Sequence, residues 1–527
     1  MLAGLFSFQS MATFLSIRSA DAALSIMTSR WDFQSHFTIY NMLRTQGSVI
    51  PMAPLPSTGG SWGFIEYPQG FHSLLATFAE IVSPISKGLD AELVSYINLQ
   101  AILCGLTVVL ITAGICSLPS VRQNALLLSP AIAIAVAAWV MGPGAIPIFE
   151  GFANFYVGCG MAAATILSFL APAKKISIVV VAAMGAGIVG TSNNWILLVS
   201  LIAVVALIAL TSVVLHRRLY SRRWWVSLAL IGAITSVGVL LPISQVLPLL
   251  GAAEGILAAS GGMPLPEFGW VLAIISLVIT LGVANLNQPR ATLLQDLARR
   301  RAGTASLGIL LPVAVCAWLA YTQTNGSGSL SYYFYKYLVA VELVAWALFV
   351  AALATLLTRY KAASTSRTPV ALGVTLCVSA LAATQVFGFS VTGQDEVGLP
   401  PTALPMVQSS LQEEQIANIS PTVQRILASA HLGQEHDAVY VSAGSDINDT
   451  LALRWQLGMN NMLTTKYMGL EAQLAEITLE NAENIDIISD VLASDADLYV
   501  MVNPELYARV SGTLDNPEFE HRLLNVG

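Results

Sequence analysis

Long apolar segments alternate with short polar loops through the first 390 residues of the chain. A membrane-spanning helix needs about 20 predominantly apolar residues, and eleven segments approach that length. They lie near residues 2–17, 93–118, 125–146, 153–173, 176–192, 194–215, 225–247, 269–286, 305–322, 333–357 and 368–389. The pattern predicts an all-α polytopic membrane protein with about eleven transmembrane helices.

Two segments depart from this regular pattern. Residues 70–92 have a short apolar run and carry several ionisable side chains, so we expect them to lie at the outer membrane surface or to dip into it. Residues 2–17 are a short first span with no Lys or Arg before them. Either the true N-terminus lies elsewhere or the segment is a cleaved signal peptide, although the basic region that such a peptide needs is missing.

The pattern changes after Phe389, where a Gly- and Pro-containing linker begins. It then predicts helices at 411–432, 446–459 and 468–494, and strands at 438–443 and 497–504. Strands separated by helices indicate a small α/β domain with a parallel sheet. We therefore expect a transmembrane domain over 1–390 and a soluble domain over 391–527.

Charge separates the same two regions. Only 10% of all residues are charged, against about 25% in soluble domains. Residues 391–527 contain 20 acidic and 5 basic residues, whereas the basic loops of the first 390 residues fall on one side of the predicted spans. By the positive-inside rule that side is the cytoplasm. The protein is thus expected in the plasma membrane, with its N-terminus cytoplasmic and its acidic tail extracytoplasmic. The acidity does not suit an anionic polymer, so no nucleic acid partner is expected and a neutral glycan fits better.

Metal and disulfide chemistry receive little support from the sequence. The five cysteines all lie in apolar stretches, none lies in the tail, and no CxxC occurs. They are expected to act as small hydrophobic residues. No HxxxH motif appears either. We predict neither a metal nor another cofactor.

Candidate chemistry gathers in the predicted first outer loop, residues 18–92. Residues 29–46 read as an amphipathic helix that places Asp32 and His36 one turn apart. A structural role for Asp32 is the alternative, because Ser29 and Asp32 match the spacing of a helix capping box. Farther along, the sequence EYPQGFH sets Glu66, Tyr67 and His72 close together in a segment rich in Pro and Gly. Long ordered loops with such groups are commonly functional.

These features carry a resemblance to a known family. An Asp-x3-His helix after the first span, a Tyr-Pro-x-Gly-x-His loop, many spans and a soluble tail resemble the GT-C class of membrane glycosyltransferases, in particular its actinobacterial cell-envelope branch. SYYFYKYL, at the outer start of a late span, is similar to a Tyr-Tyr-x-x-Lys feature of that branch. The resemblance implies transfer of one sugar, arabinofuranose or mannose, from a polyprenyl-phosphate donor to a glycan acceptor of the cell envelope. It also implies that Asp32 is the general base.

A donor phosphate at the outer face would need a cation. Lys336 is the only Lys or Arg expected there between Lys87 and the tail, and it follows Tyr332 and Tyr333. The alternative is a lysine that extends toward the interface within an aromatic belt. The full set of expected substrate-binding residues is His36, Glu66, Tyr67, His72, Glu150, Asn193, Asn194, Tyr332, Tyr333 and Lys336.

Two other functions use the same architecture. A transporter or flippase for a lipid-linked glycan would bind the same lipid phosphate but would need no base. A non-catalytic scaffold for envelope assembly would act through its tail. The partners expected under the first hypothesis are the lipid-linked donor, a glycan acceptor, membrane lipids and other cell-envelope enzymes.

Overall fold

The computed structural model describes nine stretches of the chain, and its contacts divide them into two compact units. The described residues are 2–57, 59–82, 88–171, 176–247, 268–287, 293–326, 328–363, 412–481 and 483–527. The bundle unit comprises Met1–Ala12 and Ala101–Gln408, and the two-segment unit comprises Thr13–Gln100 and Ser409–Gly527. The predicted domain boundary near residue 390 lies outside the described residues.

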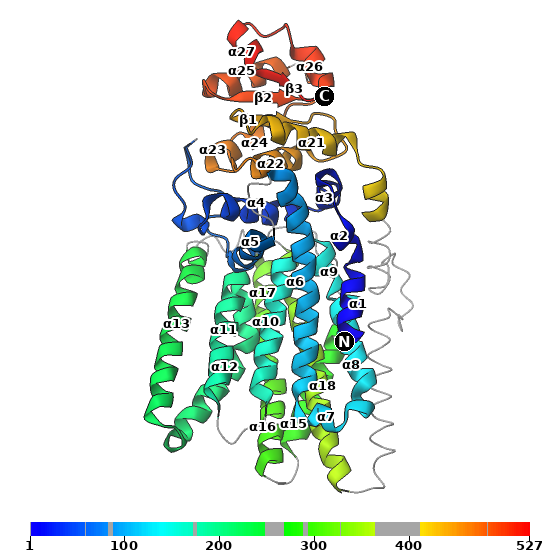
Figure 1. Cartoon of the computed structure of the whole chain (residues 1–527), viewed down its shortest axis with the longest axis vertical. Coiled ribbons are helices and arrows are strands. Elements are labelled where there is room, and N and C mark those ends of the chain that lie inside the picture. The colour runs from blue at the N-terminus through cyan, green and yellow to red at the C-terminus, as the bar shows by residue number, and fades with distance from the viewer. Residues whose placement is uncertain are drawn as a thin grey trace. The chain divides into compact units, whose positions relative to one another are not determined.

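The bundle unit is helical. After α1 (Leu2–Ser10) and the later part of α6 (Leu89–Ser117), its elements are α7 (Pro119–Gln123), α8 (Ala125–Val140), α9 (Ala145–Phe149), α10 (Ala153–Leu170), α11 (Ile178–Asn194), η3 (Ile196–Leu198), α12 (Val199–Leu215), η4 (Arg217–Leu219), α13 (Arg222–Val246), α15 (Phe268–Leu286), α16 (Leu293–Leu307), α17 (Leu310–Gly326) and α18 (Tyr332–Ala363). The apolar window of α18 is 94% buried, so α18 is the central helix of the bundle (Figure 1).

Seven helical segments of the described residues are long and apolar enough to cross a membrane. Three shorter apolar helices, at Gly70–Val82, Ile178–Asn194 and Val271–Leu286, accompany them. The predicted first span differs, because residues 2–17 form α1 and α2 (Ala12–Ser16) rather than one helix. The predicted span 368–389 falls outside the described residues. The chain is a membrane protein with fewer full-length spans in its described part than the eleven expected.

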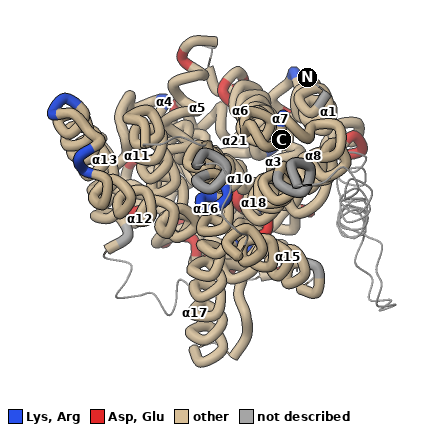
Figure 2. The backbone as a smooth tube through the Cα atoms, turned by 90° about the horizontal axis from the view of Figure 1, so that it is seen from below, with Lys and Arg blue, Asp and Glu red and all other residues tan. Residues whose placement is uncertain are grey.

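Several basic residues of the bundle lie at one of its ends. Arg122 lies on α7, and Arg222 and Arg223 open α13. Figure 1 places α7, the turn between α12 and α13, and α16 at the same end. Seen from that end, blue Lys and Arg positions mark α13 and α16 (Figure 2). This grouping agrees with the basic loops sharing one side of the predicted spans.

Small residues allow the bundle helices to pack closely. A Cβ atom on Gly187 of α11 would lie 1.9 Å from Thr165 Oγ1 of α10. One on Gly160 of α10 would lie 2.2 Å from Thr107 Cγ2 of α6. Helix backbones in membranes approach closely where such residues meet. Larger side chains at these two glycines would force α10 away from its neighbours.

The two-segment unit joins regions that are far apart in the sequence. Its first segment contains α2, α3 (Ala20–Met27), α4 (Trp31–Gln46), η1 (Ile50–Met52), α5 (Gly70–Val82) and the start of α6. α4 packs against α22 (Asp449–Met459) of the second segment. Gln34 Nε2 donates to the Arg454 carbonyl at 2.8 Å, and Asn41 Nδ2 donates to the Gly458 carbonyl at 3.0 Å.

α4 differs from its prediction in two respects. Phe33, His36 and Asn41 point in different directions around the helix, yet all three are buried, so α4 is not an amphipathic surface helix. Its N-cap is Arg30, without a side-chain cap, and the Ser29 hydroxyl donates to the Ile26 carbonyl. The predicted capping box is therefore wrong.

The second segment forms a parallel three-stranded sheet in the order β1-β2-β3. β1 (Ala438–Val441) and β2 (Tyr499–Val502) confirm the two predicted strands, and Val439 pairs with Val500. β3 (Leu523–Asn525) was not predicted, because three residues are too few to show a period. The remaining helices are α21 (Pro421–Leu432), α23 (Thr465–Met468), α24 (Glu471–Leu474), α25 (Asn484–Ser494), α26 (Pro504–Val510) and α27 (Pro517–Arg522).

The Pro- and Gly-rich loop after α4 is fastened to the second segment. Trp62 forms an antiparallel bridge with Thr464. The Gly63 amide donates to the Leu463 carbonyl at 2.8 Å, and the Thr465 amide donates to the Ser61 carbonyl at 2.9 Å. The Trp62 indole also donates to the Pro54 carbonyl at 2.7 Å. These bonds fix the loop that carries the Tyr-Pro-x-Gly-x-His sequence.

Candidate functional site

Two predicted histidines meet in the two-segment unit. His36 is on α4, and His72 is in the first turn of α5, which packs against α4. His36 Nδ1 lies 3.0 Å from His72 Nε2, and the rings stack with centroids 5.1 Å apart. Both side chains are buried. Residues separated by 36 positions in the sequence thus form one hydrogen-bonded pair, which we call the histidine pair.

Tyr67 joins the histidine pair. Its ring centroid lies 5.7 Å from that of His36 and 6.1 Å from that of His72, both in edge-on geometry. A turn closed by the Tyr67 amide on the Phe64 carbonyl positions the ring. Glu66, the neighbouring residue in the sequence, is exposed. The structure therefore brings together three of the predicted residues of this loop and helix.

Asp32 lies in the first turn of α4, one helical turn before His36, and is half-buried. Side chains four residues apart share a helix face. The N-terminal end of a helix favours negative side chains. The position therefore suits a carboxylate that keeps access to solvent or substrate while the histidine pair lies buried behind it.

Burial changes the protonation behaviour of His72. Desolvation lowers the pKa of His72 to about 3. At neutral pH this ring is uncharged, so one histidine of the pair donates the shared N–H and the other accepts it. His72 therefore suits the orientation of neighbouring groups rather than the uptake of a proton from solution.

An ion cluster on the same helix was not predicted. Arg44 of α4 makes two bonds to Glu92 of α6, with Nη2 to Oε1 at 2.7 Å and Nε to Oε2 at 3.0 Å. The Tyr40 hydroxyl donates to Glu92 Oε2 at 2.7 Å, and Arg44 also pairs with Glu80 of α5. Burial together with Glu92 raises the pKa of Tyr40, and Glu92 raises that of Arg44. The i, i+4 spacing of Tyr40 and Arg44 could have indicated that the two side chains share one face of the helix.

Lys336 is the centre of a second cluster, in the bundle unit. Its Nζ lies 3.9 Å from the ring centroid of Phe152 and between 5.4 and 5.7 Å from those of Phe155, Tyr332 and Trp195. We call these four rings and the lysine the aromatic cage. Lys336 is 3% exposed and lies in the first turns of α18. Three of the rings come from other elements, and none of those three was predicted.

The remaining predicted residues of the bundle unit are buried or half-buried. Glu150 follows α9 and is buried, and Tyr333 packs against Tyr332 with centroids 4.4 Å apart. Asn193 Nδ2 donates to the carbonyls of Val189 and Gly238, both at 2.9 Å. That amide therefore joins α11 to α13.

Asn194 is the last residue of α11, and its side chain is also directed into the bundle. Its Nδ2 donates to the Gly190 carbonyl at 2.7 Å. Its Oδ1 is buried and has no hydrogen-bond partner among the described residues. A buried amide oxygen of this kind is an available acceptor.

The described part of the chain offers no cluster of metal-ligating side chains. Within the described ranges, no three His, Cys, Asp or Glu side chains gather as a metal site requires. The histidine pair supplies two nitrogens that bond to each other.

Comparison with known proteins gave one structural similarity to report. No family profile matches the sequence, and neither does any curated protein. Among solved structures, ArnT from Cupriavidus metallidurans bound to undecaprenyl phosphate is 14% identical, with 99% of this chain and 85% of that chain covered at a TM-score of 0.33. A similarity of this degree does not establish a common fold.

Proposed function

We propose that the protein is a GT-C-type glycosyltransferase of the cell envelope. It transfers a single sugar, arabinofuranose or mannose, from a polyprenyl-phosphate donor to a glycan acceptor on the outer face of the membrane. Asp32 is the general base, and Lys336 binds the donor phosphate. His36, Tyr67 and His72 position Asp32 or the sugar.

One observation carries the proposal: the Asp-x3-His helix and the Tyr-Pro-x-Gly-x-His loop meet in space. His36 and His72 lie 3.0 Å apart with Tyr67 against both rings. The two sequences belong to different elements, α4 and the loop that leads into α5, and a purely structural loop would not need to unite their histidines. The meeting point is one turn from the half-buried Asp32.

The proposed reaction balances without a cofactor. An acceptor hydroxyl attacks the anomeric carbon, and Asp32 takes the hydroxyl proton as the new glycosidic bond forms. The bond from the anomeric carbon to the phosphate oxygen breaks, and the electron pair leaves with the polyprenyl phosphate. Lys336 would offset the charge of that phosphate through a charge-assisted hydrogen bond. The aromatic rings beside Lys336 suit a site that holds a sugar close to the lysine.

Sugar transfer by the full-length protein tests the proposal. Synthetic polyprenyl-phosphate arabinofuranose and mannose would be offered with short glycan acceptors to the wild type, Asp32→Asn and Glu66→Gln. Loss of a general base lowers the rate by about 10²–10⁴-fold. We expect that loss in Asp32→Asn, and a loss of the same size in Glu66→Gln alone would make Glu66 the base instead.

The other outcomes separate the alternatives. Equal rates in wild type and Asp32→Asn would remove Asp32 from the mechanism. Donor binding without transfer by the wild type would favour the flippase, which needs no base. Deleting the tail is a poor test of the scaffold, because Asn41 of α4 donates to carbonyls of α22 at 3.0 Å. Point substitutions that leave α22 in place are the appropriate variants.

A further inference from the structure

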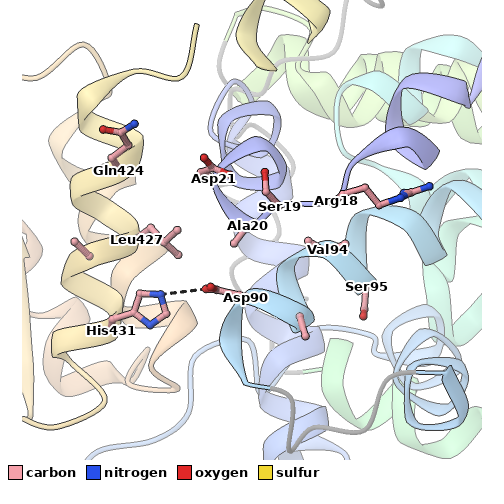
Figure 3. A pocket seen from close by; sticks show the side chains of 12 residues that line it. Arg18, Ser19, Ala20, Asp21, Asp90, Val94, Ser95, Gln424, Leu427 and His431 are labelled. Carbon is pink, nitrogen blue, oxygen red and sulfur yellow. Dashed lines mark ion pairs between the residues drawn. The ribbon is translucent and has the colours of Figure 1, made fainter. Parts of the chain in front are cut away.

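A groove lies in the two-segment unit between α21 on one side and α3 with the start of α6 on the other (Figure 3). Its volume is about 730 Å³, within the usual range of ligand sites, roughly 300–1,000 Å³. None of the residues proposed for catalysis or donor binding lines it. Its walls belong to both segments of the unit, so it exists only where the tail packs on the first outer loop.

The walls combine an apolar floor with polar groups. Leu427 and Ala428 of α21 lie opposite Val94 of α6. Figure 3 shows Gln424 facing Asp21 across the groove, with Leu427 between that pair and His431. A surface of this kind can contact the carbon skeleton of a ligand and hydrogen-bond to its polar groups at once.

The charged side chains of the groove already have partners. His431 Nε2 lies 3.0 Å from Asp90 Oδ1. Asp21 Oδ1 accepts from the Ala22 amide at 2.8 Å. Arg18 Nη1 donates to the carbonyls of Leu15 and Ile17, both at 2.7 Å. Side chains of both signs, Arg18 on one hand and Asp21 and Asp90 on the other, line the groove, so it does not select strongly for a cation or an anion. Their remaining lone pairs and hydrogens suit an uncharged polar ligand.

We propose that this groove binds a neutral oligosaccharide and, resting on the proposed function, that the oligosaccharide is the acceptor glycan. The volume accommodates several linked sugars, and the carboxylates, hydroxyls and amide that line it are suitable partners for sugar hydroxyls. Arg30, the residue before α4, lies three residues after α3 ends at Met27, so the groove wall leads along the chain to the helix of Asp32.

Binding of neutral oligosaccharides to the full-length protein in detergent tests the inference without any lipid donor. Short arabinan and mannan fragments would be titrated by calorimetry. Ala428→Trp fills the groove from an exposed position of α21, and Ala508→Trp places the same side chain at an exposed position of α26 outside the groove. We expect at least about tenfold weaker binding in Ala428→Trp and unchanged binding in Ala508→Trp.

A milder pair of variants guards against misfolding. Gln424→Ala removes one side-chain amide of the groove, and Gln434→Ala makes the same change at an exposed position just past α21. One neutral hydrogen bond corresponds to about threefold to tenfold in affinity. We expect a loss of that size in Gln424→Ala and none in Gln434→Ala.

The outcomes distinguish this inference from the proposed function. Absence of binding by the wild type, equal binding in Ala428→Trp and wild type, or preference for a charged oligosaccharide would each overturn the groove assignment, even if sugar transfer occurs. Groove-dependent binding supports the assignment by itself, even if the transfer assay with Asp32→Asn shows no enzyme.

Discussion

Two buried cations, one in each unit, are surrounded in different ways. Arg44 lies in the two-segment unit and makes a two-point contact with the buried carboxylate of Glu92. Lys336 lies in the bundle unit against the rings of the aromatic cage, the nearest centroid being 3.9 Å from its Nζ. A two-point contact with a carboxylate fixes the orientation of a guanidinium, whereas the face of an aromatic ring attracts a cation and places an apolar surface beside it.

This contrast suggests different roles for the two side chains. The pairing of Arg44 connects α4 to α6 and, through Glu80, to α5. The histidine pair lies on α4 and α5, so Arg44 serves the geometry of the candidate site. The rings around Lys336 include Trp195 and Tyr332. Substitutions at the two positions test whether Arg44 is structural and whether Lys336 binds a phosphate.

The largest effect on stability is expected at Arg44. Arg44→Met leaves the buried Glu92 without its two-point partner, and removing one side of a buried ion pair costs about 3–5 kcal/mol. Denaturant titration of the purified protein measures the change. The control is Arg425→Met, which removes a partly exposed pair with Glu505 and should cost no more than about 1 kcal/mol. Equal losses in the two variants would contradict a structural role specific to Arg44.

Lys336→Met is expected to weaken donor binding. A hydrogen bond to a charged group contributes about 1.5–3 kcal/mol, so affinity for a polyprenyl phosphate should fall by about 10- to 100-fold. Lys336→Arg keeps the charge and should retain part of the affinity. Fluorescent polyprenyl phosphate in nanodiscs gives the dissociation constants. Unchanged affinity in Lys336→Met would identify the lysine as part of an aromatic belt instead.

The smallest effect concerns the pH dependence contributed by His72. Its pKa is about 3 in the folded protein and about 6.5 in an unfolded chain. Between these values the unfolded state binds the proton, so stability falls as the pH is lowered below about 6.5, by up to about 1.4 kcal/mol per pH unit. Thermal unfolding between pH 7 and pH 5 measures this slope. His72→Gln should flatten it, and an identical slope in the variant would show that another group is responsible.

The sequence predicted those helices and strands whose apolar residues follow a clear local pattern. The apolar segments, the helix from Trp31 and the strands at Ala438 and Tyr499 follow from periodicity and composition. The burial of α4 on several faces could not be predicted, because α22, which covers part of it, lies more than 400 residues away in the sequence. The missed capping is of the same kind: once tertiary packing fixes Arg30 before the helix, the Ser29 cap is not used.

The candidate sites divide in the same way. His36, Tyr67 and His72 were predictable as residues, but their meeting depends on the packing of α4 against α5 and on the loop bonds to Leu463 and Thr465. The local Tyr-Tyr-x-x-Lys pattern could not predict that the rings of Phe152, Phe155 and Trp195 lie around Lys336. Glu92 was assigned to a surface segment, and only the structure shows that it pairs with Arg44.

The packing of α4 against α22 also delays the folding of α4 during synthesis. Asn41 and its acceptor Met459 are 418 residues apart, and a ribosome adds about 5–20 residues per second. The amide of Asn41 is therefore synthesised roughly 20–80 s before its partner, and the helices from α7 to α18 are translated in between. During that interval the polar and aromatic face of α4 must be covered by water, by lipid headgroups or by a chaperone. Slowed translation within the bundle should lengthen this vulnerable period, and proteolysis of nascent chains in the first 100 residues would report it.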